Sequence, residues 1–132
     1  MYLLDTCVVS DFIKGHRNTL NKVKNVNPHH LFLSTISLME IEYGLQKNPQ
    51  KAYTIQTIIM DFLSTIRILD FRDQEAKCAG NIRSDLNSKG TPIGPYDILI
   101  AATAVHNKLT LVTSNVNEFK RVENLLWENW RD

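Results

Sequence analysis

The sequence predicts an α/β fold built on a parallel sheet. Short apolar runs alternate with longer segments of helical periodicity along the whole chain, as is typical of βαβ units. Two of these runs stop on a carboxylate, Asp5 and Asp70. In open α/β sheets, ligands bind outside the carboxyl ends of the strands. Asp5 is therefore expected at the edge of the sheet where chemistry takes place.

Composition limits the class of protein. The chain has 132 residues, 43% of them apolar and 22% charged, which predicts one globular domain over residues 1–132. No apolar run is long enough for a membrane helix, and the start lacks the basic residues of a signal peptide. Two distant cysteines, Cys7 and Cys78, give no disulfide pattern. We therefore expect a cytoplasmic protein, and the net charge of +1 means that nucleic acid would be bound by local basic clusters.

The first part of the chain predicts two strands and two helices. Residues 2–5 form the first strand, and 6–14 form a helix that Gly15 ends. A second helix covers residues 18–26. The run 31–33 is apolar throughout, as expected for a strand buried on both faces.

The middle of the chain predicts two helices, 36–45 and 50–63, and a third strand at 66–69. The second of these helices carries a broad apolar stripe, most of which we expect in the core. An excess of apolar surface there would mark a dimer interface or a partner groove. The stripe consists of Tyr53, Ile55, Ile58, Ile59 and Phe62.

The last part of the chain begins with a helix over 73–87. The segment 88–95 contains two glycines and two prolines and is expected to be a loop. Pro95 suits a helix start, and 96–107 is the most apolar helix of the protein. A fourth strand at 110–113, a helical turn at 117–121 and a last strand at 125–127 complete the chain.

Three carboxylates stand at or just after junctions where a strand or loop enters a helix. Asp5 and Asp97 would each serve as ordinary helix-terminal residues, and Glu40 as a solvated surface charge. In a parallel sheet with right-handed crossovers, however, the strand ends gather along one edge. Three converging carboxylates would not all stay ionised without a divalent cation, and hard oxygen ligands favour Mg²⁺ or Mn²⁺. Glu42 instead faces Gln46 and solvent.

Four segments together carry a family resemblance. They are MYLLDT at 1–6, SLMEIEYG at 37–44, PIGPYDILIA at 92–101, and LVTSN at 111–115 followed by Glu118 and Phe119. In this order and spacing the chain resembles the VapC-type PIN-domain ribonuclease toxins of bacterial toxin–antitoxin pairs. No single motif is specific, but the ordered set is.

The resemblance implies a three-layer α/β/α sandwich with a parallel sheet of four or five strands. It also implies a Mg²⁺- or Mn²⁺-dependent endoribonuclease toxin that cuts RNA, typically tRNA, and so inhibits translation. Its implied partners are a small VapB-type antitoxin and further copies of the chain, in a homodimer or a larger toxin–antitoxin assembly. By position, Asp5, Glu40 and Asp97 match the catalytic, metal-binding acids of the family.

Other positions take supporting roles. Thr6 and Thr113 are expected to position Asp5 or a phosphate through their hydroxyl groups. Asn115 falls at a fourth polar position where many relatives have Asp, and Glu118, one helical turn away, is the alternative residue to complete the site. Cys7 stands where the family usually has Asn, so weaker hydrogen bonding is expected there. No base lies near enough in the sequence to make Cys7 a nucleophile.

Candidate RNA contacts are Lys14, Arg17, Lys120 and Arg121, which lie in basic clusters near the proposed edge. Other functions share parts of this pattern. A receiver-type phosphotransfer module would use Asp70 as acceptor, but it needs an acidic pair after the first strand, which is missing here. A catalytically degenerate PIN domain that only binds RNA or protein is another: the presence of Asp5, Glu40 and Asp97 argues against it, whereas the departures at Cys7 and Asn115 keep it open.

Overall fold

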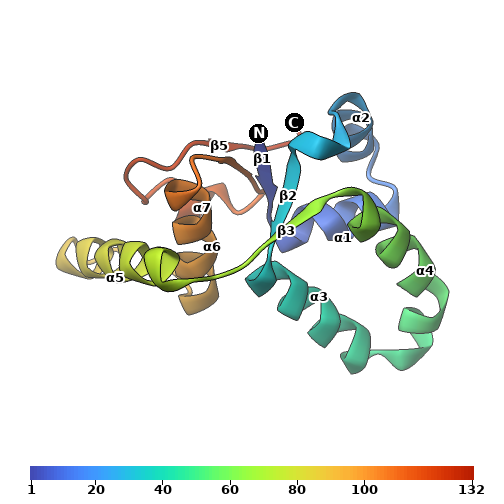
Figure 1. The fold of residues 1–132 in the computed structure, drawn as a ribbon, viewed down its shortest axis with the longest axis horizontal. Helices are drawn as coiled ribbons and strands as arrows, with labels where there is room; N and C mark the ends of the chain where they lie inside the picture. The colour runs from blue at the N-terminus through green and yellow to red at the C-terminus, as the bar shows by residue number, and fades with distance from the viewer.

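The sheet has five strands, all parallel, in the order β3-β2-β1-β4-β5. The computed structural model describes residues 1–132, and Figure 1 shows β1 at the centre of the fold. The strands are β1 (Tyr2–Leu4), β2 (Leu31–Ser34), β3 (Arg67–Leu69), β4 (Thr110–Val112) and β5 (Trp127–Glu128). The predicted parallel α/β sheet is confirmed.

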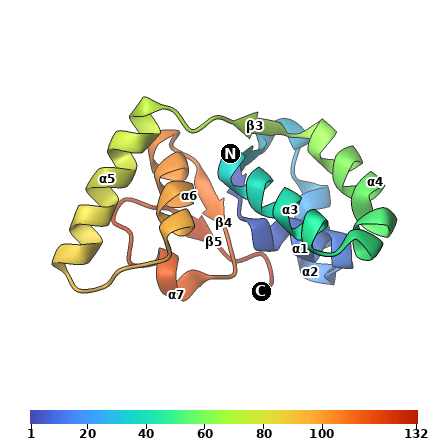
Figure 2. The same ribbon diagram turned by 90° about the horizontal axis from the view of Figure 1, so that it is seen from below.

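Helices cover both faces of this sheet. They are α1 (Thr6–Lys14), α2 (Arg17–Asn25), α3 (Thr35–Lys47), α4 (Pro49–Thr65), α5 (Asp73–Ser88), α6 (Pro95–His106) and α7 (Val116–Phe119), with a 3-10 turn at Pro28–His30. Both views place α5, α6 and α7 at one end of the molecule and α1 to α4 at the other (Figures 1 and 2). The result is the three-layer α/β/α sandwich that the resemblance implied.

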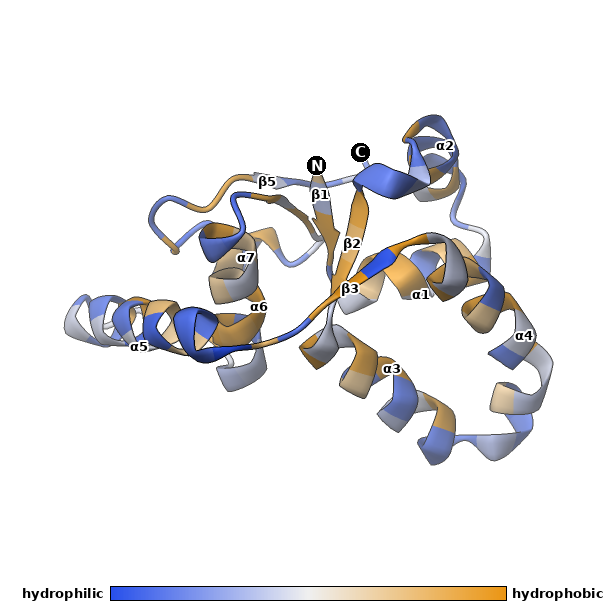
Figure 3. Cartoon of the chain, viewed as in Figure 1, coloured by the Kyte–Doolittle hydropathy of each residue, from blue (hydrophilic) through white to orange (hydrophobic).

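The strands are apolar along their length because they separate two hydrophobic cores. Leu3 and Leu111 belong to the core under α5, α6 and α7, whereas Leu4 and Val112, the next residues, belong to the core under α1, α2 and α4. Successive side chains of a strand point to opposite faces, so both must be apolar. Figure 3 shows β2 and α6 among the most hydrophobic elements. None of the helices is both long and apolar enough to cross a membrane.

The predicted elements all form, and most bounds shift by one or two residues. β1 ends at Leu4 because Asp5 already serves as the N-cap of α1, and its side chain accepts from the Thr6 amide. Gly15 ends α1 in the left-handed conformation, with φ of 75°. The last strand lies at Trp127–Glu128, later than the predicted 125–127.

The prediction for α4 was wrong. Of the stripe expected in the core, only Ile59 and Phe62 are buried, whereas Tyr53 is 88% exposed and Ile58 is 47% exposed. Met60 on the same helix is 61% exposed. The helix packs on α1 and α3 and buries only one side near its C-terminal end, where Phe62 stacks on Phe12, so periodicity identified the helix but not how much of it would be covered.

Candidate active site

Asp5 is held at the carboxyl end of the central strand. Its side chain is 7% exposed. One carboxylate oxygen accepts from the Thr6 amide at 2.8 Å, and the other accepts from the Thr113 hydroxyl at 2.8 Å. Because β1 and β4 are hydrogen-bonded neighbours, Thr113, which follows β4, lies beside Asp5. The Thr113 hydroxyl therefore contacts Asp5 directly.

Glu40 reaches the same edge from α3. The Thr6 hydroxyl donates to the Glu40 carboxylate at 2.8 Å, which ties α3 to the first turn of α1. The next acid, Glu42, accepts instead from Gln46 at 3.2 Å on the exposed side of the helix, as predicted. No atom lies within 4 Å of the place where a Cβ of Gly44 would be, so the space beside Glu40 is open.

Asp97 enters the cluster from the first turn of α6. Asn115 links it to α7: the Asn115 amide nitrogen lies 3.4 Å from the Asp97 carboxylate and 2.8 Å from the Glu118 carboxylate. The Thr113 hydroxyl accepts from the Asn115 backbone amide at 2.9 Å, which connects this group to Asp5. Asn115 and Glu118 are therefore both part of the site, with Asn115 acting as a donor between two carboxylates.

The acids repel one another. Burial, a hydrogen bond with Glu118, and the negative charges of Asp5, Glu118 and Glu40 raise the pKa of Asp97 to about 8. The pKa of Glu118 is lowered by the same hydrogen bond and by Asn115, so the shared proton resides on Asp97. Burial also raises the pKa of Asp5. Burial and the neighbouring carboxylates thus favour the neutral form of Asp97, and the charge of Arg121 acts on Glu118 instead.

The donor set fits a divalent cation. Asp5, Glu40, Asp97 and Glu118 offer hard oxygen atoms, and no lysine, arginine or histidine forms an ion pair with any of them. The side chains do not yet converge into a group of three close enough to enclose an ion. A cation would have to draw them together, and it would displace the proton from Asp97.

The predicted RNA contacts lie around this edge at different distances. Lys14 is exposed at the far end of α1, roughly 13 Å along the helix from Asp5, and Arg17 is exposed at the start of α2. Lys120 is exposed just after α7. Arg121 donates to the backbone carbonyl of Pro92 at 3.0 Å and so holds the loop that leads to Asp97.

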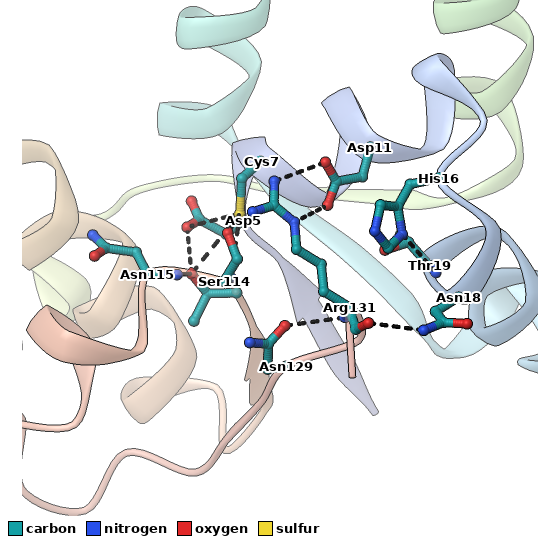
Figure 4. Close-up of polar contacts among 11 residues, drawn as sticks. Asp5, Cys7, Asp11, His16, Asn18, Thr19, Ser114, Asn115, Asn129 and Arg131 are labelled. Atoms are coloured by element: carbon teal, nitrogen blue, oxygen red, sulfur yellow. Dashed lines mark hydrogen bonds and ion pairs between the residues drawn. The ribbon is translucent and has the colours of Figure 1, made fainter.

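Sequence reasoning missed two sets of contacts. Cys7 was expected to weaken the hydrogen bonding, but its thiol lies 3.7 Å from the Asp5 carboxylate, and it accepts from the Ser114 amide at 3.5 Å and hydroxyl at 3.4 Å. Burial raises the pKa of the Cys7 thiol, as suits a residue that is not a nucleophile. The second set is a bidentate ion pair between Asp11 and Arg131, 120 residues apart (Figure 4). No local pattern in the sequence indicates that pair.

Comparison with known proteins gives consistent matches over the whole fold. The family model described as PIN domain matches residues 2–125. Ribonuclease VapC2 of Rickettsia felis is 39% identical, covering 98% of this chain and 98% of that protein. The tRNA(fMet)-specific endonuclease VapC of Salmonella typhimurium is 35% identical, covering 98% and 97%. The crystal structure of DNA-bound VapBC from Salmonella typhimurium superposes with a TM-score of 0.88 at 35% identity, covering 98% of this chain and 97% of that one.

Proposed function

The chain belongs to the PIN-domain family and, within it, to the VapC ribonucleases, and from this we propose that it cuts RNA with Asp5, Glu40 and Asp97. The observation that carries the proposal is the set of carboxylates gathered at one sheet edge without a neutralising side chain, where the pKa of Asp97 rises to about 8. Such an edge is unfavourable by itself and becomes favourable around a cation.

We propose Mg²⁺, or Mn²⁺, as that cation, held by Asp5, Glu40 and Asp97 with Glu118 completing the set. A divalent ion here would stabilise negative charge on the scissile phosphate and lower the pKa of water. The protein's own side chains orient the carboxylates. Thr113 and Thr6 aim the carboxylates of Asp5 and Glu40 through their hydroxyl groups.

The proposed reaction is an in-line hydrolysis. A water oxygen attacks phosphorus while one of the carboxylates accepts the proton from that water. The bond from phosphorus to the 3′ oxygen breaks, and this oxygen leaves with a proton. The products are a 5′-phosphate and a 3′-hydroxyl.

We propose tRNA as the substrate, because a relative 35% identical to this chain is named for cleaving tRNA(fMet). An enzyme of this kind would act in the cytoplasm, where tRNA is found. Lys14, Arg17, Lys120 and Arg121 are proposed to contact backbone phosphates on either side of the cut, with Arg121 also holding the Pro92 carbonyl. Charge reversal at Lys14 and Arg17 tests this: unchanged cleavage and unchanged salt dependence would exclude those two residues.

The partner is proposed to be a small antitoxin, in a larger assembly with further copies of the chain, since structural relatives are VapBC complexes. Its seat is proposed at a pocket of about 210 Å³ between α3 and α4, which Glu40 and Thr6 line on one side and Ile55 and Ala52 on the other. The exposed apolar side chains of α4 continue this surface. A segment bound there would lie against Glu40 and block the site.

Cleavage of bacterial RNA, including tRNA, by the purified protein tests the activity. With Mg²⁺ or Mn²⁺ we expect discrete fragments that vanish with EDTA and with Asp97→Asn, a loss of at least about 1000-fold. Mapping the fragment ends would identify the RNA and the cut. No cleavage by folded, metal-bound protein would leave a catalytically degenerate binding module as the function.

Co-purification with the protein encoded beside it tests the partner. Ile55→Glu places a charge in the pocket and should abolish co-purification while the purified variant still cuts RNA. Gln56→Glu adds the same charge on an exposed position of α4 outside the pocket lining and is the matched control. Equal retention of the partner by both variants would move its seat elsewhere.

A further inference from the structure

The C-terminal tail delivers an arginine to the helix that carries the active site. The Nε and Nη2 atoms of Arg131 donate to the two carboxylate oxygens of Asp11, at 2.7 and 2.9 Å (Figure 4). Asp11 is only 6% exposed, whereas the side chain of Arg131 is 46% exposed. The carboxylate is therefore buried under the guanidinium, and the guanidinium faces outward.

The tail is fixed in place. Asn129 accepts from the Arg131 amide at 3.0 Å, and the Asn18 side chain donates to the Arg131 carbonyl at 2.9 Å. Trp130, which lies between Asn129 and Arg131 in the sequence, is buried, and its ring centroid lies 5.1 Å from that of Tyr2. The arginine is thus presented from a rigid backbone, with little side-chain freedom left to lose on binding a ligand.

Arg131 lies next to the carboxylate cluster. Asp11 and Cys7 are four residues apart on α1 and so share a face of the helix. Figure 4 shows the guanidinium between these two side chains. Cys7 in turn lies 3.7 Å from the Asp5 carboxylate. Along α1, Asp11, which binds the guanidinium, lies nearer to Asp5 than Lys14 does.

The Arg131 guanidinium has N–H donors that Asp11 does not use. It carries five N–H groups, and Asp11 takes one from Nε and one from Nη2, which leaves three. Asp11 is buried and cannot turn towards solvent, so it fixes the plane of the Arg131 guanidinium. An arginine oriented by a buried carboxylate, with free N–H groups on its outer side, is suited to bidentate recognition of phosphate.

We propose that Arg131 binds a backbone phosphate of the RNA next to the scissile one, and that Asp11 positions it. The proposal rests on the ribonuclease function above and adds a substrate contact to the same site. Asp11 itself does not touch the RNA. The pair has an alternative role, which is a staple that only fastens the C-terminal tail to α1. The experiment must distinguish this role from phosphate binding.

The first measurement is the affinity of the full chain for fluorescently labelled, unfractionated tRNA in EDTA, over a range of salt. Arg131→Ala should weaken binding about tenfold and reduce the slope of log K against log salt by about 0.7–0.9, the loss of one phosphate contact. Arg131→Lys should keep the wild-type slope of log K against log salt, because the positive charge remains. It should weaken binding less than Arg131→Ala does, because an ammonium group replaces the bidentate guanidinium. The matched control is Arg83→Ala, which removes an exposed arginine of α5 that makes no ion pair.

The second measurement separates positioning from stapling. In the Asp11→Asn background, Arg131→Ala should change kcat/KM much less than in the wild type, because the two residues act as one unit. If Arg131→Ala lowers only the melting temperature, and its tRNA affinity, salt slope and kcat/KM equal those of Arg83→Ala, the pair is a staple and the proposal is wrong. If the wild type neither binds nor cuts RNA, the proposed function itself fails.

Discussion

Asp5 enters the cluster from the end of the central strand and Asp97 from the first turn of α6, and the two differ in their burial and hydrogen bonding. Asp5 is almost fully buried, and both of its oxygens accept hydrogen bonds from Thr6 and Thr113. Asp97 is only partly buried, its nearest donor is the Asn115 amide at 3.4 Å, and Glu118 adds a second negative charge. One acid is satisfied by the fold, and the other is not.

The difference separates a preformed half of the site from a half that needs a ligand. A buried, hydrogen-bonded carboxylate holds its geometry without help and stabilises the junction of β1 and α1. Asp97 keeps a proton up to about pH 8 because it is partly buried and its neighbours are also acidic, so a cation would favour its ionised form. We infer that Asp5 holds its position without a ligand, and that Asp97 loses its proton when a cation binds.

The largest test of this comparison is a pair of substitutions with opposite effects on stability. Asp5→Ala removes the N-cap and leaves the buried Thr113 hydroxyl without its acceptor, so the metal-free melting temperature should fall by about 5 °C. Asp97→Asn removes a repelled acid and should raise it by about 3 °C. Thermal denaturation at pH 8 with EDTA measures both. Shifts of the melting temperature with the same sign would show that the two acids do not contribute to stability in opposite ways.

The pH dependence of the metal-free protein sharpens the contrast. The folded protein holds the Asp97 proton up to about pH 8, whereas the unfolded chain releases it near the ordinary value of 3.8. The stability that this proton contributes is complete below pH 4 and is lost as the pH rises to about 8. The melting temperature should therefore fall between pH 5.5 and 8.5, and less so in Asp97→Asn or with a divalent cation present. A rise for the metal-free wild type over that range would contradict the assignment.

The smallest expected effect concerns the link between the halves. Thr113→Val keeps the shape of the side chain but removes the hydroxyl that donates to Asp5 and accepts from the Asn115 amide. We expect a loss of about 1–2 kcal/mol in the free energy of unfolding and a roughly tenfold drop in cleavage. Urea denaturation and the RNA assay measure these, with Thr113→Ser as the control that should retain both. If valine is tolerated, the hydroxyl does not connect the two halves.

Two apolar helices show where prediction from the sequence stops. Both α4 and α6 were recognised from their composition. Almost every side chain of α6 from Ile98 to Ala104 is buried, as its all-round apolar sequence indicates. On α4, Tyr53 and Met60 are exposed, because that helix packs mainly on its neighbours α1 and α3. Periodicity predicts a helix, but the area that neighbours cover depends on where the chain places them.

The sequence by itself determined the element order, the parallel sheet and the acids of the site. Strands apolar on both faces require helices on both sides, and right-handed crossovers bring the strand ends to one edge, so local pattern and topology place Asp5, Glu40 and Asp97 at the same edge. Only the tertiary structure decided which acid is satisfied, that Cys7 and Ser114 form a bridge beside Asp5, and that Arg131 meets Asp11. These contacts join residues more than a hundred positions apart, and their strength depends on burial and distances of a few ångströms, which no local pattern of residues encodes.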